Sequence, residues 1–439
     1  MHADGLGDWI SPEKRAALVA EREGDLRRLY EKGPLDIKEA GFLLDCAIIL
    51  FDGGRSPEAE HWLERITTGF GGDSNHAGDS TEILLNAKLY RAFCLRRMGR
   101  EREALDLARV AVKESDGLSC RMISRVLPDG RAEYREWQKN LRTFALRLLR
   151  DARMHEMAKT KANLRIIDVP APDSPHKSVR FYFRMPAGGS PAPHKILAVV
   201  PSDNHPAPEL CFGTNPWTVF CDTMGWVLCA PEFDLYMDSA AVPYHDAQSW
   251  SGNALINAVD ELAKTEPVEP SKLLLHGYGG GAQFVATFAR FAPERCLAAS
   301  VNGTGLLFAK DFIPGLHPMA EIRNVPLLIT EGAEDDLREK GLSSLDAGTA
   351  SASLAEDAGL AVIWRSWPGV GHRANPEMEI LSRAFLAGAA SDNLQTGLFI
   401  GDRRTWEVFP AGDPKIQNIP PPSRQPLGNP AIAGAWGGK

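Results

Sequence analysis

A glycine-rich turn between a strand-like run and a helix-like run constrains the fold of this chain more than any other feature. Residues 272–275 read Lys-Leu-Leu-Leu, glycine recurs at 277, 279, 280 and 281, and a helix-like stretch covers 283–291. Glycine allows backbone conformations with positive φ and lets neighbouring segments approach closely. We therefore expect a sharp turn from a buried strand directly into a helix, inside a sheet whose strands alternate with helices.

The same alternation extends over residues 162–390. Apolar runs that are continuous, rather than alternating, indicate strands covered on both faces. Such strands joined by helices predict an α/β domain with a doubly wound, mostly parallel sheet. The predicted strands are 164–169, 179–183, 196–200, 227–230, 272–275, 297–301, 326–330 and 361–366, and the predicted helices are 216–224, 249–264, 283–291, 345–358 and 377–389.

Residues 1–160 are predicted to form a separate helical domain, because apolar residues recur there at helical spacing over 37–51, 58–66, 81–98, 103–112 and 134–157. Two of its helix pairs resemble a tetratricopeptide repeat. In each, a Gly-Arg turn ends one helix and a Glu-Ala pair opens the next, at 54–55 with 58–59 and at 99–100 with 103–104. The spacing exceeds the ~34 residues of that repeat, and a polar insert at 71–80 accounts for the excess. A generic helical hairpin bundle is the alternative.

Residues 391–439 form a Pro/Gly-rich C-terminal extension. We expect residues 391–408 to pack on the α/β domain. From residue 409 onward, the density of proline and glycine predicts no regular elements. This part is expected to be either a disordered tail or an extended arm, which two subunits can exchange in a homo-oligomer.

Residues 162–390 resemble α/β-hydrolases of the bacterial esterase or polyhydroxyalkanoate-depolymerase type. The run Gly-Tyr-Gly-Gly-Gly-Ala-Gln-Phe matches the G-x-S-x-G turn of that family, with Gly277 and Gly281 as the outer glycines. The resemblance implies an α/β-hydrolase fold and a triad in the order serine, acid, histidine. Gly279 stands at the position of the nucleophilic serine and has no side chain that can attack a carbonyl carbon.

The resemblance also assigns the other two members of the triad. Asp335 follows the strand at 326–330 with the family's G-x-x-D spacing, and Asp336 is the alternative acid. His372 follows the strand at 361–366 in Pro-Gly-Val-Gly-His, and it is the only one of 11 histidines in that context. The implied role of the carboxylate is to orient the imidazole and to stabilise its charged form.

An oxyanion hole is implied as well. Its first donor is the backbone N–H of Gly280, the residue after the nucleophile position. The second donor comes from the loop after the strand at 196–200, where Ser202 or Asp203 replaces the His-Gly of many relatives.

Three interpretations of Gly279 remain open. The chain is a natural pseudo-hydrolase that serves as a binding or scaffold module, because loss of the nucleophile removes most of the rate. Alternatively, it is a carboxylic-ester hydrolase in which glycine has been substituted for serine, with Asp335 and His372 retained. In the third interpretation, His372 acts as general base on a water that occupies the vacated space.

The composition and the motifs absent from the sequence exclude several classes of partner and indicate a cellular compartment. The net charge is −8, which argues against a general nucleic-acid binder or a binder of anionic membranes. The seven cysteines include no C-x-x-C pair, so neither a disulfide framework nor a zinc site is expected. No phosphate loop, dinucleotide fingerprint or metal-ligand spacing is present, and we therefore expect no cofactor. No apolar run approaches the ~18 residues of a membrane span, and the start of the chain lacks a leader pattern, so a cytoplasmic protein is expected.

Two kinds of partner remain. A small ester or acyl ligand fits the α/β-hydrolase resemblance. The helical domain carries no chemical motif, so we expect it to recruit a protein partner or to cover a substrate.

Overall fold

The computed structural model describes sixteen stretches of the chain, and every structural statement below refers to them. They are residues 17, 19–52, 55–71, 77–114, 123–126, 132–134, 141–172, 174, 177–188, 193–202, 207–233, 244–303, 315–335, 338–339, 342–394 and 397–438. Within these stretches, no helix combines the length and the apolar character needed to cross a bilayer.

The N-terminal part is helical, as predicted. Its helices are α2 (Glu23–Glu31), α3 (Ile37–Asp52), α4 (Ser56–Gly69), α5 (Ala77–Arg97), α6 (Glu101–Glu114) and α7 (Leu141–Lys159). From α3 to α7, each helix packs against the next one in the chain. Ala59 and Ala104, which open the second helices of the two similar pairs, are fully buried. Small side chains at these positions let the helices approach closely.

Two details of this region differ from the sequence prediction, and the turn at Gly99 agrees with it. A hairpin of β1 (Ile123–Val126) and β2 (Ala132–Tyr134) precedes α7, so the predicted helix at 134–157 begins only at Leu141. Residues 77–80 of the predicted polar insert belong to α5, whereas residues 72–76 lie outside the described residues. Gly99 takes a φ of 76° just after α5, which is the left-handed conformation that ends a helix. Gly54, its counterpart in the first pair, lies outside the described residues.

An eight-stranded sheet forms the centre of the molecule, in the order β12-β9-β8-β7-β5-β6-β4-β3. The five ladders from β12 to β6 are parallel, and the two that join β6, β4 and β3 are antiparallel. The strands are β3 (Leu164–Ala171), β4 (Lys177–Arg184), β5 (Ile196–Val200), β6 (Val227–Glu232), β7 (Leu273–Tyr278), β8 (Cys296–Asn302), β9 (Leu327–Gly332) and β12 (Val362–Trp367). This confirms the predicted doubly wound, mostly parallel sheet, which has the α/β-hydrolase arrangement.

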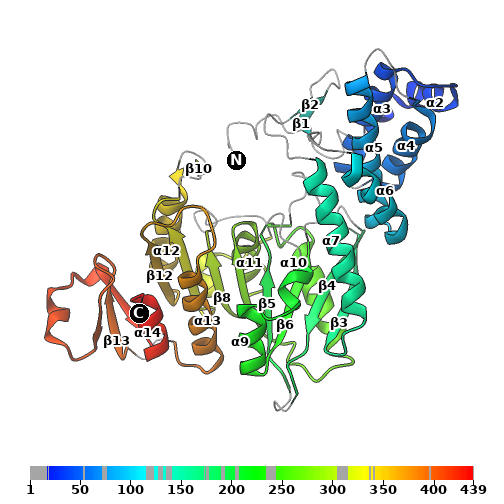
Figure 1. The fold of residues 1–439 in the computed structure, drawn as a ribbon. Helices are drawn as coiled ribbons and strands as arrows, with labels where there is room; N and C mark the ends of the chain where they lie inside the picture. Colours follow the sequence, from blue (N-terminus) through cyan, green and yellow to red (C-terminus); the bar gives the residue numbers. More distant parts are fainter. Residues whose placement is uncertain are drawn as a thin grey trace.

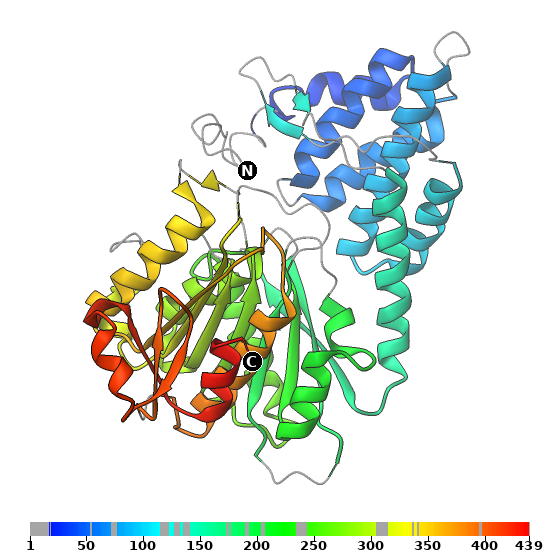
Figure 2. The same ribbon diagram turned by 60° about the vertical axis from the view of Figure 1, so that its left-hand side comes forward.

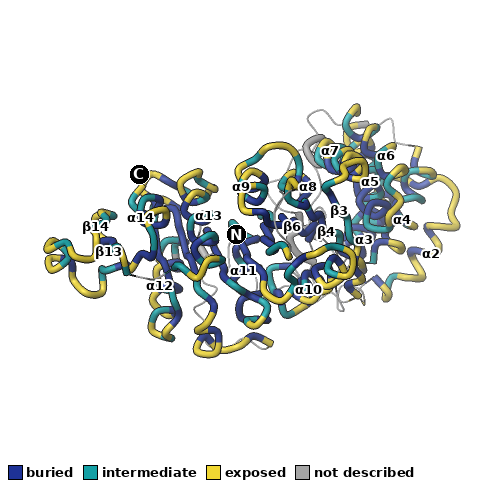
Figure 3. Tube along the Cα trace, turned by 90° about the horizontal axis from the view of Figure 1, so that it is seen from below, coloured by how far each residue is buried: buried dark blue, intermediate teal, exposed yellow. Residues whose placement is uncertain are grey.

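Helices cover both faces of the sheet, as the continuous apolar strands require. One face packs against α10 (Ser251–Leu262), α11 (Gly280–Phe291) and α12 (Ser344–Asp357). The other packs against α8 (Ala207–Cys211), α9 (Pro216–Met224) and α13 (Pro376–Ala390), together with the C-terminal helix α14 (Pro430–Trp436). Figure 3 shows the result, with buried strands between helices whose outward sides are exposed.

The N-terminal helices and the C-terminal segment lie at opposite ends of this sheet (Figure 1). Helix α7 runs along β3, the last strand on one side, and the other N-terminal helices stand beyond it. The C-terminal segment lies against β12, the last strand on the other side, and Figure 2 shows it from a second direction.

The prediction that residues from 409 onward have no regular elements is wrong. Strands β13 (Phe399–Asp402), β14 (Val408–Pro410) and β15 (Arg424–Leu427) form a small antiparallel sheet, and α14 follows. Pro430 occupies a position that needs no backbone N–H, in the first turn of α14 after the N-cap Asn429. Gly401 makes room for the buried ring of Trp436, because a Cβ there would lie 2.3 Å from that ring.

Candidate functional site

The turn from β7 into α11 has the geometry of a nucleophile elbow. Gly279 has φ 54° and ψ −122°, a conformation that is strained for residues with a side chain. A Cβ on Gly277 would lie 2.3 Å from the backbone of Gly281, and a Cβ on Gly281 would lie 2.2 Å from the carbonyl oxygen of Val200. Both outer glycines are therefore required by close backbone contacts. The N–H of Gly279 donates to the carbonyl of Asn302 at 2.9 Å, which ties the turn to β8.

The structure brings Asp335 and His372 together at the ends of β9 and β12. His372 Nδ1 lies 2.7 Å from Asp335 Oδ2. Because an ionised carboxylate only accepts hydrogen bonds, the proton of the neutral imidazole lies on Nδ1, and Nε2 is left as an acceptor. The Asp335 side chain is 1% exposed and that of His372 is 35% exposed, so the carboxylate is shielded while the imidazole reaches solvent. Asp336, the alternative acid, lies outside the described residues.

The imidazole faces the empty nucleophile position. A Cβ placed on Gly279 would lie 4.0 Å from His372 Nε2 and 3.6 Å from the Cβ of Ser202. Both are ordinary contact distances, so a small side chain fits here. A hydroxyl on that Cβ would come within hydrogen-bond reach of Nε2 in the rotamer that points toward the imidazole. The structure therefore places Gly279, His372 and Asp335 in the order that the sequence predicts for a triad, with no side chain at the first position.

The two residues predicted to supply oxyanion donors, Gly280 and Ser202, both lie next to position 279. Gly280 is the first residue of α11, and the first N–H groups of a helix have no acceptor within the helix. The helix N-terminus also carries partial positive charge, which favours a developing oxyanion. Ser202 follows β5 and lies beside the elbow, as expected. Asp203 lies outside the described residues.

One neighbour of the site was not identified from the sequence. The ring of Tyr278 lies 5.6 Å from the ring of His372, centroid to centroid. Tyr278 also packs over Gly303, where a Cβ would approach its ring to 3.1 Å. Burial raises the pKa of the phenol, so the hydroxyl is neutral and able to donate near neutral pH. The signal in the sequence for Tyr278 is its position directly before Gly279.

His276, in contrast, lies away from the dyad. Its ring lies tilted against that of Trp217 with centroids 4.2 Å apart, and its Nδ1 is 3.2 Å from Ser300 Oγ. Burial lowers the pKa of this imidazole to about 3, so it stays neutral. His276 is therefore a core residue.

A second cluster of ionisable groups lies where the N-terminal helices meet the sheet. Arg96 of α5 donates to Glu101 of α6 at 2.7 Å and to Glu232 at the end of β6 at 3.1 Å. Arg180 of β4 donates to Glu101 at 2.9 Å, and His155 Nε2 of α7 lies 3.6 Å from the same carboxylate. The ligand atoms of Glu101, His155 and Glu156 lie within 4.8 Å of one another, a spacing that a metal ion also requires. The two guanidinium groups already occupy the Glu101 carboxylate, so this cluster is a charge network and a poor cation site.

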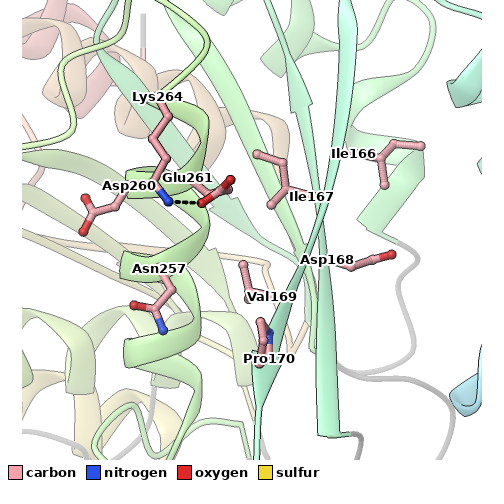
Figure 4. A pocket seen from close by; sticks show the side chains of 9 residues that line it. All are labelled: Ile166, Ile167, Asp168, Val169, Pro170, Asn257, Asp260, Glu261 and Lys264. Atoms are coloured by element: carbon pink, nitrogen blue, oxygen red, sulfur yellow. Dashed lines mark hydrogen bonds and ion pairs between the residues drawn. The ribbon is translucent and has the colours of Figure 1, made fainter.

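An open hollow at the far edge of the sheet contains none of the site residues. It lies between β3 and α10 and is lined by residues 166–170 with Asn257, Asp260, Glu261 and Lys264. In Figure 4, Lys264 pairs with Glu261 on the α10 side of the hollow, and Asp168 points away from α10. The hollow is separated from the elbow strand β7 by β5, β6 and β4.

Comparison with known proteins gives a distant relative. No family model matches the chain. Over 119 residues the chain is 26% identical to an acyl-protein thioesterase 1 from Gibberella zeae, which covers 27% of this chain and 48% of that protein. The chain therefore spans about half the length of this curated relative.

Several solved structures are similar to the chain. An S-formylglutathione hydrolase from Agrobacterium tumefaciens is 14% identical, with a TM-score of 0.39 over 52% of this chain and 94% of that one. A fungal esterase from Rhizomucor miehei is 16% identical, with a TM-score of 0.38 over 55% and 88%. Esterase 2 from Thermogutta terrifontis is 15% identical, with a TM-score of 0.36 over 48% and 85%. The mostly parallel eight-stranded sheet of this chain, with helices on both faces, is that of the α/β-hydrolase fold.

Proposed function

We propose that this chain is a catalytically impaired pseudo-hydrolase that binds a small ester or acyl ligand at the elbow and acts as a binding or scaffold module. One observation carries the proposal: Gly279 has the backbone conformation of a nucleophile, beside a complete His372–Asp335 pair, and has no atom that can attack. Removing the nucleophile from a serine triad costs on the order of 10⁶ in kcat. The backbone N–H of Gly280, which we propose as an oxyanion donor, does not depend on that side chain.

Glycine suits the elbow conformation better than serine does. A residue with a side chain held in such a region of φ/ψ space costs about 1–3 kcal/mol. Gly279 avoids this cost, so loss of the nucleophile comes with a gain in stability. A binding module retains such a substitution because it gains stability and loses only the chemical step.

A carboxylic-ester hydrolase with glycine in place of its serine is the second candidate. The retained pair of Asp335 and His372 favours it, together with the space that remains for a side chain at position 279. A third route, in which His372 activates a water in that space, requires no serine. The three candidates predict different esterase activities for this chain and for its Gly279→Ser variant.

The deciding experiment measures hydrolysis of p-nitrophenyl acetate and butyrate by the chain and by Gly279→Ser. The proposal predicts no measurable turnover by the chain and at least about 10³-fold more by Gly279→Ser, because the base and the oxyanion donors are in place. The control is Gly279→Ser combined with His372→Ala, which is expected to lose this gain. Turnover by the chain itself that disappears in His372→Ala contradicts the proposal and supports the water route.

A silent Gly279→Ser variant has a different meaning. If that variant keeps the thermal melt of a folded protein and hydrolyses neither ester, the site does not accept short acyl esters. A ligand of other chemistry must then be sought.

We propose that the helical region supplies the scaffold function by binding a protein partner, in line with its tetratricopeptide-like helix pairs. Cytoplasmic location is part of this proposal, because the six described cysteines are all buried free thiols. Cross-linking of the full chain in a lysate, followed by mass spectrometry, tests it. Cross-links to a partner that map to residues 19–114 support the proposal. Cross-links that map only to residues 162–390 contradict it.

A further inference from the structure

The strand β12 is the last strand of the sheet on its side, and its outer edge needs partners. Among the described strands, β9 is its one ladder partner. An edge strand presents a row of backbone N–H and C=O groups, and such a row is a template for pairing with another chain. The sequence Val-Ile-Trp-Arg-Ser-Trp of β12 is rich in the β-branched and aromatic residues that favour this pairing.

Gln425 of β15 satisfies the outer edge of β12 with its side chain. The N–H of Trp364 donates to Gln425 Oε1 at 3.0 Å, and Gln425 Nε2 donates to the carbonyl of Val362 at 2.9 Å. These two backbone groups flank Ile363. A residue of a parallel neighbouring strand that lay opposite Ile363 would make the same two hydrogen bonds with its own peptide groups. The side-chain amide of Gln425 therefore makes, at this point of the edge, the two hydrogen bonds that a ninth strand would make.

Arg403 fixes the orientation of this amide. Its Nε and Nη2 donate to Gln425 Oε1 at 3.1 and 2.6 Å. Arg403 is held in turn by Glu356 at the end of α12, to which its Nη1 donates at 3.1 Å. Because these donors point at one atom, that atom must be the oxygen of the amide, and the nitrogen faces Val362.

Trp436 of α14 satisfies the next outward group of the edge. Its Nε1 donates to the carbonyl of Trp364 at 2.9 Å, and its ring is fully buried. Beside it, the Arg365 guanidinium carbon lies 4.5, 4.1 and 5.4 Å from the ring centroids of Trp367, Trp406 and Trp436. These contacts attach the C-terminal segment along the length of β12.

We propose that residues 397–438 form an edge cap that keeps β12 from pairing with a second copy of this chain. A second copy is the partner that the edge fits, because two β12 strands related by a two-fold axis run antiparallel and expose the same groups to each other. Such pairing would join two eight-stranded sheets into one. The cap makes this association impossible as long as Gln425 and Trp436 hold the edge.

The test compares Gln425→Leu with Gln417→Leu, which alters an exposed glutamine of the same segment. Hydrogen exchange of the Trp364 amide and the mass in solution by light scattering are measured for both variants. Gln425→Leu is expected to raise the exchange rate of that amide about tenfold or more, the effect of one lost hydrogen bond. It is also expected to form a dimer whose fraction rises with concentration, whereas Gln417→Leu leaves both quantities unchanged.

A second variant guards against misfolding of the first. Trp436→Phe keeps an aromatic ring against Arg365 and removes the donor to the Trp364 carbonyl. It is expected to raise dimer formation less than Gln425→Leu does. An unchanged exchange rate at Trp364, or folded variants that show no mass increase at any concentration, overturns the proposal.

Discussion

The two ends of the central sheet are covered in chemically opposite ways. Beside β4 and β6, the N-terminal helices meet the sheet through buried charges, with Arg96 between Glu101 and Glu232. At β12, the C-terminal segment uses a neutral amide and an indole N–H. The one buried cation at that end, Arg365, is surrounded by indole rings, and no described carboxylate pairs with it. The first contact is made by ion pairs, whereas the two side chains that bind the edge of β12 are uncharged.

Because of this difference, the two ends of the sheet should lose different amounts of stability when a contact is removed. A buried ion pair balances a large desolvation cost against a large attraction, so losing one partner is expensive. A side-chain amide that pairs with backbone groups carries no net charge, and its loss costs only the unsatisfied groups. The helical end is therefore the more sensitive to substitution and pH, and the C-terminal end is the more tolerant.

The largest expected effect comes from Arg96→Met. It leaves Glu232 buried at the end of β6 without its main counter-charge, and the free energy of unfolding should fall by about 3–5 kcal/mol. Denaturant unfolding measures this change. Arg27→Met, which removes an exposed pair with Glu23, is the matched control and should cost about 0.5 kcal/mol or less.

Adding Glu232→Leu to Arg96→Met sharpens the interpretation. The double variant removes both charges, so it should recover most of the lost stability. A double variant as unstable as the single one would show that packing, and not the buried charge, sets the cost.

The parts of the fold that the sequence predicts are those with local patterns. The bounds of β5 and α9 agree with prediction because β5 is a continuous buried run and α9 begins at an Asn215 capping box and ends at Gly225. Asp335 and His372 were assigned from the resemblance to α/β-hydrolases, which places each of them directly after a strand, and the structure brings the two side chains together. Local order along the chain was enough for the bounds of β5 and α9.

The parts that the sequence does not predict depend on distant contacts. Arg96 and Glu232 are 136 positions apart, and no local pattern links them. The C-terminal segment was misjudged because its proline and glycine content is typical of disorder, whereas Gly401 and Pro430 occupy positions where those residues are required. Gln425 acts only through the edge of β12, which lies more than 60 positions earlier in the chain.

A smaller effect is expected from acid, again at the helical end. Burial, followed by the nearby Arg180 and Arg96, lowers the pKa of His155 to about 3, well below its usual 6.5. The folded state therefore resists protonation of His155, so stability is complete above pH 6.5 and falls as the pH drops towards 3. At pH 5 the loss should be about 1–2 kcal/mol. His155→Gln, which keeps a partner for Tyr182, should flatten this dependence.

His276 titrates with the same sign, and its pKa of about 3 also comes from burial. His276→Gln is therefore the control that separates the two contributions. When the pH is lowered to 5, hydrogen exchange should become faster at the amides of α6 and α7 before it does at the amide of Trp364, because no described histidine lies beside the C-terminal cap. An equal increase in the exchange rate at both ends would contradict the difference in pH sensitivity between them.

The smallest effect is expected from Arg365→Met at the C-terminal end. Burial lowers the pKa of this guanidinium to about 10, which shows that its charge is held at a desolvation cost. The three indole rings return about 1–2 kcal/mol through cation–π attraction, so the two contributions oppose each other. Methionine keeps the length and the contact with the rings and removes both contributions. The free energy of unfolding should therefore change by less than about 1 kcal/mol. A loss as large as that of Arg96→Met would mean that both ends of the sheet depend on charge, and the contrast between them would disappear.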